Sequence, residues 1–152
     1  MQLGDFWPGN HVPEKSFANH VEKLAGDILH ACELQWYYEP TTFPLEMDEQ
    51  GKMKKGFAPD FYLPQIKAYF EVTYARSMSG KNRKLRMMEE KHPHVIVFLG
   101  VFRDDVMYVS RGYSGEYGTL GSKKFELPVR GDPRELKKYL LEQTGERQQI
   151  AA

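Results

Sequence analysis

Hydrophobic positions along this chain recur with two spacings, one typical of helices and one typical of strands. Helical spacing holds from Phe17 to Cys32, which predicts a helix packed on one face, with Ser16 as a candidate N-cap. The same spacing holds from about Gly80 to Lys91. A last helical pattern begins with Asp132 as its cap, and Gly145 is expected to lie beyond its end. The sequence therefore predicts three helices.

Strand patterns fill the stretches between these helices. In the segment 67–74 apolar side chains alternate with Tyr69, Glu71 and Thr73, as in a strand that lies in a sheet. The apolar run 95–100 predicts a strand covered on both faces. Further extended segments are 34–40, 41–45, 58–64 and 106–110, while 46–56 is expected to be an exposed turn and 111–124 a glycine-rich loop. We expect an α/β or α+β fold, in which helices flank a central mixed β-sheet.

Composition and charge limit the classes of protein. The chain has 152 residues, of which 41% are hydrophobic and 28% charged, so we expect one globular domain over residues 1–152. The 21 basic and 21 acidic side chains cancel, so attraction to a polyanion would need local clustering. A single cysteine, Cys32, excludes a disulfide framework. Without a signal peptide or a long apolar run, we expect a cytoplasmic protein with no membrane partner.

Two acids stand among residues that favour a buried sheet. Asp60 is expected in one strand and Glu71 in the next, so a hairpin-like pairing would bring their carboxylates together. Two close carboxylates repel, and each would gain a proton or a cation. Mg²⁺, which takes oxygen ligands, would resolve the conflict. The alternative is that one acid pairs with a nearby lysine or arginine, or that both acids face solvent.

The sequence around these acids resembles that of a known protein family. "PDF" at residues 59–61, a run of strand residues and "FEVT" at 70–73 are similar to the PD-(D/E)XK nuclease superfamily. The resemblance covers Ser16 to Gly100, with residues 101–152 as an extension. It is nearest in layout to junction-resolving enzymes of the phage endonuclease I type. It implies a restriction-endonuclease-like core: a helix, three strands, a helix and a further strand.

The resemblance also implies roles for individual residues. Glu22 would be the acid of the first helix, Asp60 the metal-bridging aspartate and Glu71 the second acidic ligand. The backbone carbonyl of Val72 would complete the coordination of Mg²⁺ or Mn²⁺. Enzymes of the endonuclease I type act as dimers, so a homodimer is implied as well.

One position departs from the family pattern. The superfamily places a lysine two residues after the second acid, where this chain has Thr73, which cannot supply a cation. Some members of the superfamily take this charge from the following helix. That helix offers Lys81 and Lys84, three residues apart on one face, and we expect Lys84 to have the catalytic role. The alternative is that both lysines lie on a solvated face and at most contact phosphates.

Basic residues are concentrated near this motif. Six of them lie between residues 76 and 91, against two acids, and a helix of this kind could hold phosphates without reading base sequence. "KMKK" at 52–55 is a candidate second contact. The predicted contacts to nucleic acid are Arg76, Lys81, Arg83, Lys84 and Arg86. The alternative is that these charges only solvate the surface.

Other chemistry is less well supported. His92 and His94 flank Pro93, but no further ligands for a metal stand near them. The glycine-rich loop lacks the ending of a Walker loop. It is either a hairpin tip or a flap over nucleic acid, in which Tyr113 and Tyr117 would stack on bases.

These features together favour a metal-dependent endonuclease that hydrolyses DNA, with branched DNA and the DNA of phages or mobile elements as candidate substrates. The competing hypothesis, motivated by Thr73, is an inactive nuclease fold that binds DNA or a protein partner. A third is an unrelated α/β domain in which the acids are coincidental.

Overall fold

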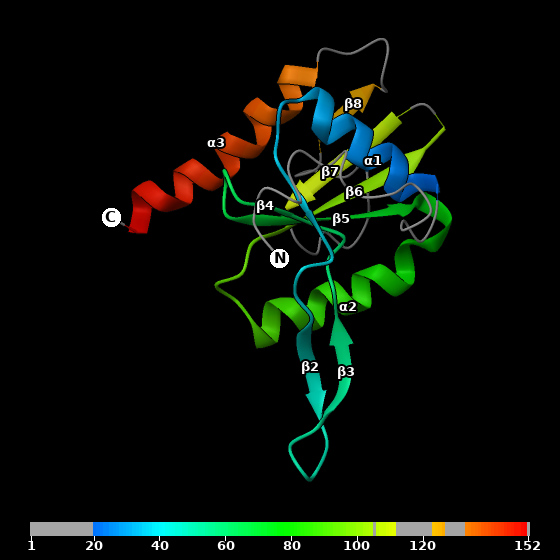
Figure 1. The fold of residues 1–152 in the computed structure, drawn as a ribbon, viewed down its shortest axis with the longest axis vertical. Coiled ribbons are helices and arrows are strands. Elements are labelled where there is room, and N and C mark those ends of the chain that lie inside the picture. The colour runs from blue at the N-terminus through cyan, green and yellow to red at the C-terminus, as the bar shows by residue number, and fades with distance from the viewer. Residues whose placement is uncertain (1–19, 105, 112–122, 127–132, 152) are drawn as a thin grey trace.

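The computed structural model describes residues 20–104, 106–111, 123–126 and 133–151. Its elements are α1 (His20–Ala31), β1 (Tyr37–Tyr38), β2 (Phe43–Met47), β3 (Met53–Phe57), β4 (Phe61–Leu63), β5 (Ala68–Tyr74), a 3₁₀ turn (Ala75–Ser77), α2 (Met78–Lys91), β6 (Val97–Arg103), β7 (Val106–Arg111), β8 (Lys123–Glu126) and α3 (Pro133–Ala151). This is a mixed α/β architecture with three helices in the described residues (Figure 1).

The central sheet has six strands in the order β1-β4-β5-β6-β7-β8. Only the β5–β6 pair is parallel, and all other neighbours are antiparallel. Parallel neighbours need a long crossover connection, which α2 supplies here. The predicted mixed sheet is therefore confirmed.

Helices cover both faces of this sheet. One face of the sheet carries α1 and α3. Helix α1 contacts β5, and Tyr139 of α3 lies against Phe98 of β6 and Phe125 of β8, all within one apolar cluster. The other carries α2, whose Leu85 and Met88 pack on β6. Every residue from Val97 to Phe102 is buried, which confirms the strand predicted to be covered on both faces. The core thus forms two apolar layers, one on each side of β5 and β6.

A separate hairpin projects from this body. Within the part of the chain that the structure describes, strands β2 and β3 pair only with each other, and they extend past α2, as Figure 1 shows. The exposed turn predicted over 46–56 is wrong in extent, because the turn occupies only 48–52 and β3 follows it. Since the first three residues of β3 are exposed, no alternation of apolar side chains marks this strand in the sequence.

The ends of two helices also bear on the predictions. Helix α3 continues through Gly145 to Ala151, so the expected end at this glycine is wrong. A glycine inside a helix costs only about 1 kcal/mol relative to alanine, which a helix with a packed face can absorb. The predicted caps Ser16 and Asp132, and the loop tyrosines Tyr113 and Tyr117, lie outside the described residues.

No helix among the described residues is long and apolar enough to cross a membrane.

Candidate functional site

Asp60 and Glu71 meet at the point where β4 begins. The backbone N–H of Asp60 donates to Oε1 of Glu71 over 2.9 Å, and Oδ2 of Asp60 accepts from the N–H of Val72 over 2.9 Å. Both acids are buried, with 3% and 1% of their surface exposed. Asp60 stands one residue before β4, so its predicted place within a strand is wrong by one position. The pairing of β4 with β5 nevertheless brings the acids together as expected.

Helix α1 supplies a third acid, Glu22. Glu22 lies in its first turn and is buried. The hydroxyl of Tyr38, on β1, donates a hydrogen bond to Oε1 of Glu22. A buried carboxylate that accepts such a bond keeps a fixed orientation, because leaving it unbonded would cost free energy. Tyr38 therefore holds the Glu22 side chain in place.

A fourth acid, Glu39, was not assigned any role from the sequence. Its backbone has φ of +45°, in the left-handed region, and its N–H donates to the carbonyl of Asp60 over 2.9 Å. One carboxylate oxygen each from Glu22, Glu39 and Asp60 lie within 4.8 Å of one another. Such a backbone conformation is unfavourable for a residue with a side chain and is often found at functional sites. This turn brings the Glu39 carboxylate to the other acids.

The cation in this cluster is Lys81, from the first turns of α2. Its Nζ lies 2.5 Å from Oε2 of Glu71. Lys84, the residue expected to have the catalytic role, is exposed one turn further along the helix. The structure places Lys81, and not Lys84, against Glu71.

The two positions after Glu71 complete the cluster. Thr73 is buried, and its hydroxyl donates to the carbonyl of Tyr74 over 3.3 Å. It shares a face of β5 with Glu71, so a side chain at this position points toward the acids. The N–H and C=O of one strand residue point to the same side of the strand. The carbonyl of Val72 therefore points to the side of β5 on which Asp60 lies.

The electrostatics follow from burial and proximity. Burial, together with the charge of Glu71 and a hydrogen bond to it, raises the pKa of Asp60 to about 9. Burial lowers the pKa of Lys81, but Glu71, Asp60 and Glu22 outweigh it, so that the pKa of Lys81 is raised. Glu39 is exposed, but partial desolvation and the charge of Glu22 raise its pKa. At neutral pH the site without metal therefore has a protonated Asp60 and a charged Lys81.

The proton on Asp60 makes the stability of the metal-free protein depend on pH. The folded-state pKa of about 9 lies above the unfolded value near 4, so the folded state binds more protons between these limits. This contribution to stability is fully present below about pH 4 and is lost as the pH rises to about 9. We expect the free energy of unfolding in EDTA to fall by up to about 1.4 kcal/mol per pH unit in this window.

Urea denaturation at several pH values, for wild type and for Asp60→Asn, measures this dependence. The variant should show a shallower fall, because asparagine does not titrate. Equal slopes for the two proteins would show that Asp60 titrates normally.

Further basic side chains on α2 and just before it are exposed. Arg83, Lys84 and Arg86 of α2 are exposed, and the guanidinium of the exposed Arg76 lies 4.5 Å from the ring centroid of Tyr74. They lie on the same helix as Lys81, or just before it. The lysines of "KMKK" lie on the hairpin, where Lys54 and Lys55 are within 4.0 Å of Glu46.

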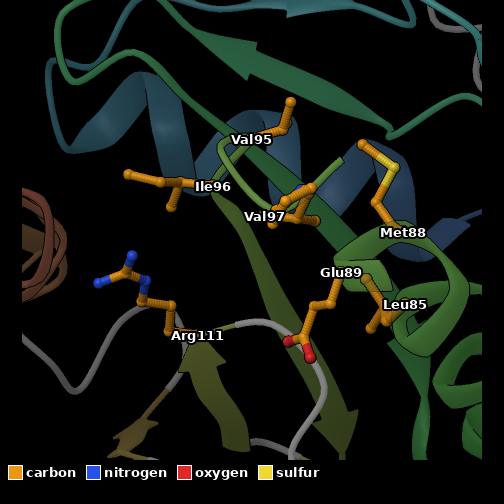
Figure 2. Close-up of a pocket in the computed structure, with 8 residues that line it drawn as sticks. Leu85, Met88, Glu89, Val95, Ile96, Val97 and Arg111 are labelled. Atoms are coloured by element: carbon orange, nitrogen blue, oxygen red, sulfur yellow. The ribbon is translucent and has the colours of Figure 1, made fainter. Parts of the chain in front are cut away.

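Two other features lie apart from the acids. A pocket of about 200 Å³ lies between α2 and the start of β6, where Figure 2 shows Glu89 and Arg111 beside aliphatic side chains. His92 Nε2 lies 2.8 Å from the carbonyl of Pro44 and so connects the end of α2 to the hairpin. This contact gives His92 a structural role.

The chain matches no protein-family model, and no curated protein or solved structure shows a significant match to it. The chemistry of the acid cluster therefore has to be inferred from its own side chains.

Proposed function

We propose that this protein is a metal-dependent endonuclease that hydrolyses phosphodiester bonds in DNA. The observation that carries the proposal is a cluster of four acids and one cation. Carboxylate oxygens of Glu22, Glu39 and Asp60 lie within 4.8 Å of one another. Beside them Glu71 accepts from the N–H of Asp60 and contacts the ammonium group of Lys81. Apart from the β2–β3 hairpin, which forms its own sheet between β1 and β4, the order α1, β1, β4, β5, α2 and β6 agrees with the order in a restriction-endonuclease-like core. This agreement supports membership of the PD-(D/E)XK superfamily.

The donor set fits Mg²⁺ or Mn²⁺. All the candidate ligands are oxygens. They are the carboxylates of Glu22, Glu39 and Asp60, which lie close together, and beside them the carboxylate of Glu71 and the carbonyl of Val72. Each carboxylate oxygen has two lone pairs, so Glu71 can keep its bonds to Asp60 and Lys81 and still bind a cation. A divalent cation would also displace the proton that the buried Asp60 carries.

Each side chain then has a role in hydrolysis. The metal, when bound, lowers the pKa of a water molecule and polarises the phosphate. Attack on phosphorus forms one P–O bond, breaks another and adds negative charge to the phosphate oxygens. Lys81 stands where it would stabilise this charge, which is the role that the superfamily gives to a lysine at the position of Thr73. Tyr38 orients Glu22.

The exposed basic residues would hold the rest of the substrate. Arg83, Lys84 and Arg86 lie on the helix that carries Lys81, so they would contact phosphates beside the cleaved bond. Such contacts do not read base sequence. The homodimer implied by the family resemblance stays a prediction.

Incubation with supercoiled plasmid, linear duplex and a four-way junction, in Mg²⁺, Mn²⁺ or EDTA, tests the proposal. We expect cleavage of at least one substrate with metal, none in EDTA, and none by Asp60→Asn. Asp27→Asn, at an exposed acid of α1, is the matched control and should cleave normally.

Two results would contradict the proposal. DNA binding without cleavage of any substrate would favour an inactive DNA-binding module instead. If the protein neither binds nor cleaves DNA, an α/β domain whose acids serve another purpose becomes the better explanation.

A further inference from the structure

The hairpin of β2 and β3 stands out from the body of the protein (Figure 1). Its turn is closed by Asp48, whose Oδ1 accepts from the N–H groups of Gln50 and Lys52 over 2.9 and 2.8 Å. Gly51 in this turn has φ of +79°, which costs a glycine little. A two-stranded hairpin is marginally stable by itself, so these hydrogen bonds help to shape it as far as its turn.

The base of the hairpin is fixed on the body. Leu45 and Phe57 are buried in the apolar cluster that α2 forms with β6. The ring of Phe43 meets that of Tyr69 edge-on, with centroids 5.2 Å apart. The direction of the hairpin is therefore set before any partner binds, which reduces the entropy lost on binding.

Two methionines are exposed at the outer end of the hairpin. Met47 and Met53 are paired across β2 and β3, and 51% of each is exposed. Among the described residues the only other exposed large hydrophobic side chain is Leu141 of α3. Exposed apolar side chains that are grouped indicate a contact surface, whereas single ones need no explanation. The outer end of the hairpin is therefore a candidate contact surface.

Positive charge surrounds the methionine pair. The three lysines of "KMKK" at 52–55 are exposed, and Asp48 and Glu49 lie in the turn before them. Lys54 and Lys55 lie 3.4 and 3.7 Å from Glu46, but exposed ion pairs of this kind contribute little to stability. Both lysines can therefore exchange this carboxylate for a phosphate at little cost.

The hairpin begins and ends beside the acid cluster. Strand β2 starts shortly after Glu39, and β3 ends shortly before Asp60. Met87 and Lys91 of α2 line, together with Met47, an open hollow of about 510 Å³ between this helix and β2. The hairpin is thus continuous with the helix that carries the exposed basic side chains. DNA whose cleaved phosphate lies at the acids would meet both.

We propose that the hairpin enters the major groove of duplex DNA beside the cleaved bond. The major groove is about 12 Å wide and admits a two-stranded ribbon, and apolar side chains contact thymine methyl groups on its floor. Met47 and Met53 would make these contacts, while the lysines of 52–55 contact the phosphates of the groove walls. Strands of five residues reach about 17 Å, or about five base-pair steps.

The inference rests on the proposed function and narrows its substrate to DNA with a duplex arm next to the cleavage point. Charged side chains also protect the edges of strands, and methionines are common at contacts between proteins. A test therefore has to distinguish DNA from a second protein chain.

The test measures binding of a fluorescent A·T-rich duplex and of oligothymidylate by fluorescence polarisation, in EDTA so that nothing is cleaved. We expect the double variant Met47→Ala, Met53→Ala to bind the duplex about ten-fold more weakly, because apolar area that the groove would cover is lost. Binding of the single strand, which has no groove, should change less than about two-fold. Leu141→Ala is the matched control and should bind both like wild type.

Two groove ligands test the assignment to the major groove. Methyl green, which occupies the major groove, should compete with the protein for the duplex, and netropsin, which occupies the minor groove, should not. Competition by netropsin alone would overturn the assignment. If the double methionine variant does not fold by circular dichroism, Lys52→Ala with Lys54→Ala takes its place. It should lower the slope of log affinity against log salt by about two.

Three results would overturn the inference. The first is unchanged duplex binding by the folded variants. The second is an equal loss of duplex and single-strand binding in the methionine variant. The third is a wild-type dimer in analytical ultracentrifugation that the methionine variant dissociates, which would assign the hairpin to a second copy of the chain.

The inference and the proposed function fail separately. Cleavage of DNA together with unchanged duplex binding by the methionine variant would refute only the role of the hairpin. Duplex binding that depends on Met47 and Met53, without cleavage of any substrate, would refute only the nuclease.

Discussion

Replacing Lys81 by alanine is expected to lower the rate of DNA cleavage by about 100-fold or more, which is typical for one well-placed electrostatic group. Nζ of Lys81 contacts Glu71, where negative charge would build up on the phosphate. Lys84→Ala is the matched control, since it removes an exposed lysine one turn away. It should weaken DNA binding slightly, lower the slope of log affinity against log salt by about one, and leave turnover nearly unchanged. Single-turnover kinetics measure the effect on the rate of cleavage, and a separate binding measurement gives the effect on DNA affinity.

A second substitution tests where the positive charge has to be. Thr73 lies on the same face of β5 as Glu71, so Thr73→Lys in the Lys81→Ala background should recover part of the lost rate. A larger loss of turnover in Lys84→Ala than in Lys81→Ala would show that Lys84 is the catalytic lysine after all. Equal turnover in wild type and Lys81→Ala would assign Lys81 to folding alone.

Asp60→Asn is expected to lower the affinity for Mg²⁺ or Mn²⁺ by about 100-fold or more, because even lost outer-shell partners of a metal cost ten- to 100-fold. In the wild type the binding of metal should release about one proton at neutral pH, because Asp60 has to ionise. Isothermal titration calorimetry in two buffers of different ionisation enthalpy measures the affinity and the proton release together.

The control for this substitution is Asp27→Asn, at an acid whose side chain is 65% exposed. It should bind metal and release protons like the wild type. Equal metal affinity in wild type and Asp60→Asn would count decisively against the site. If wild type bound metal without releasing a proton, Asp60 would already be ionised in the metal-free protein.

The sequence was sufficient for those parts of the site that depend on local pattern. Alternation along 67–74 marks β5 and puts Glu71 and Thr73 on one face, and a strand placed just before it brings Asp60 close. A run of apolar residues is enough to predict a buried strand such as β6. In each case side chains a few residues apart decide the outcome.

The remaining parts depend on contacts between distant segments. Glu39 reaches the site because β1 pairs with β4 and because its own backbone adopts a positive φ. The residues next to Glu39 in the sequence predict neither the pairing nor the backbone conformation. The choice between Lys81 and Lys84 depends on how α2 packs on the sheet, since both lysines stand on the same face of an isolated helix. The sequence does not predict the hairpin strand β3, because most of its side chains are exposed and no apolar alternation marks it.

Lys81 lies on a helix, whereas Glu71, the acid that it contacts, lies on a strand, and this affects the spacing between them in the sequence. A lysine on the same strand as its acid is fixed by the two-residue alternation, so an insertion of one residue between them would turn it to the opposite face. Here the turn Ala75–Ser77 and the start of α2 separate Glu71 from Lys81. A change of length within a turn is tolerated better than one within a strand. Chains that share this arrangement need not share the spacing between the two residues, and a motif with fixed spacing would not recognise them.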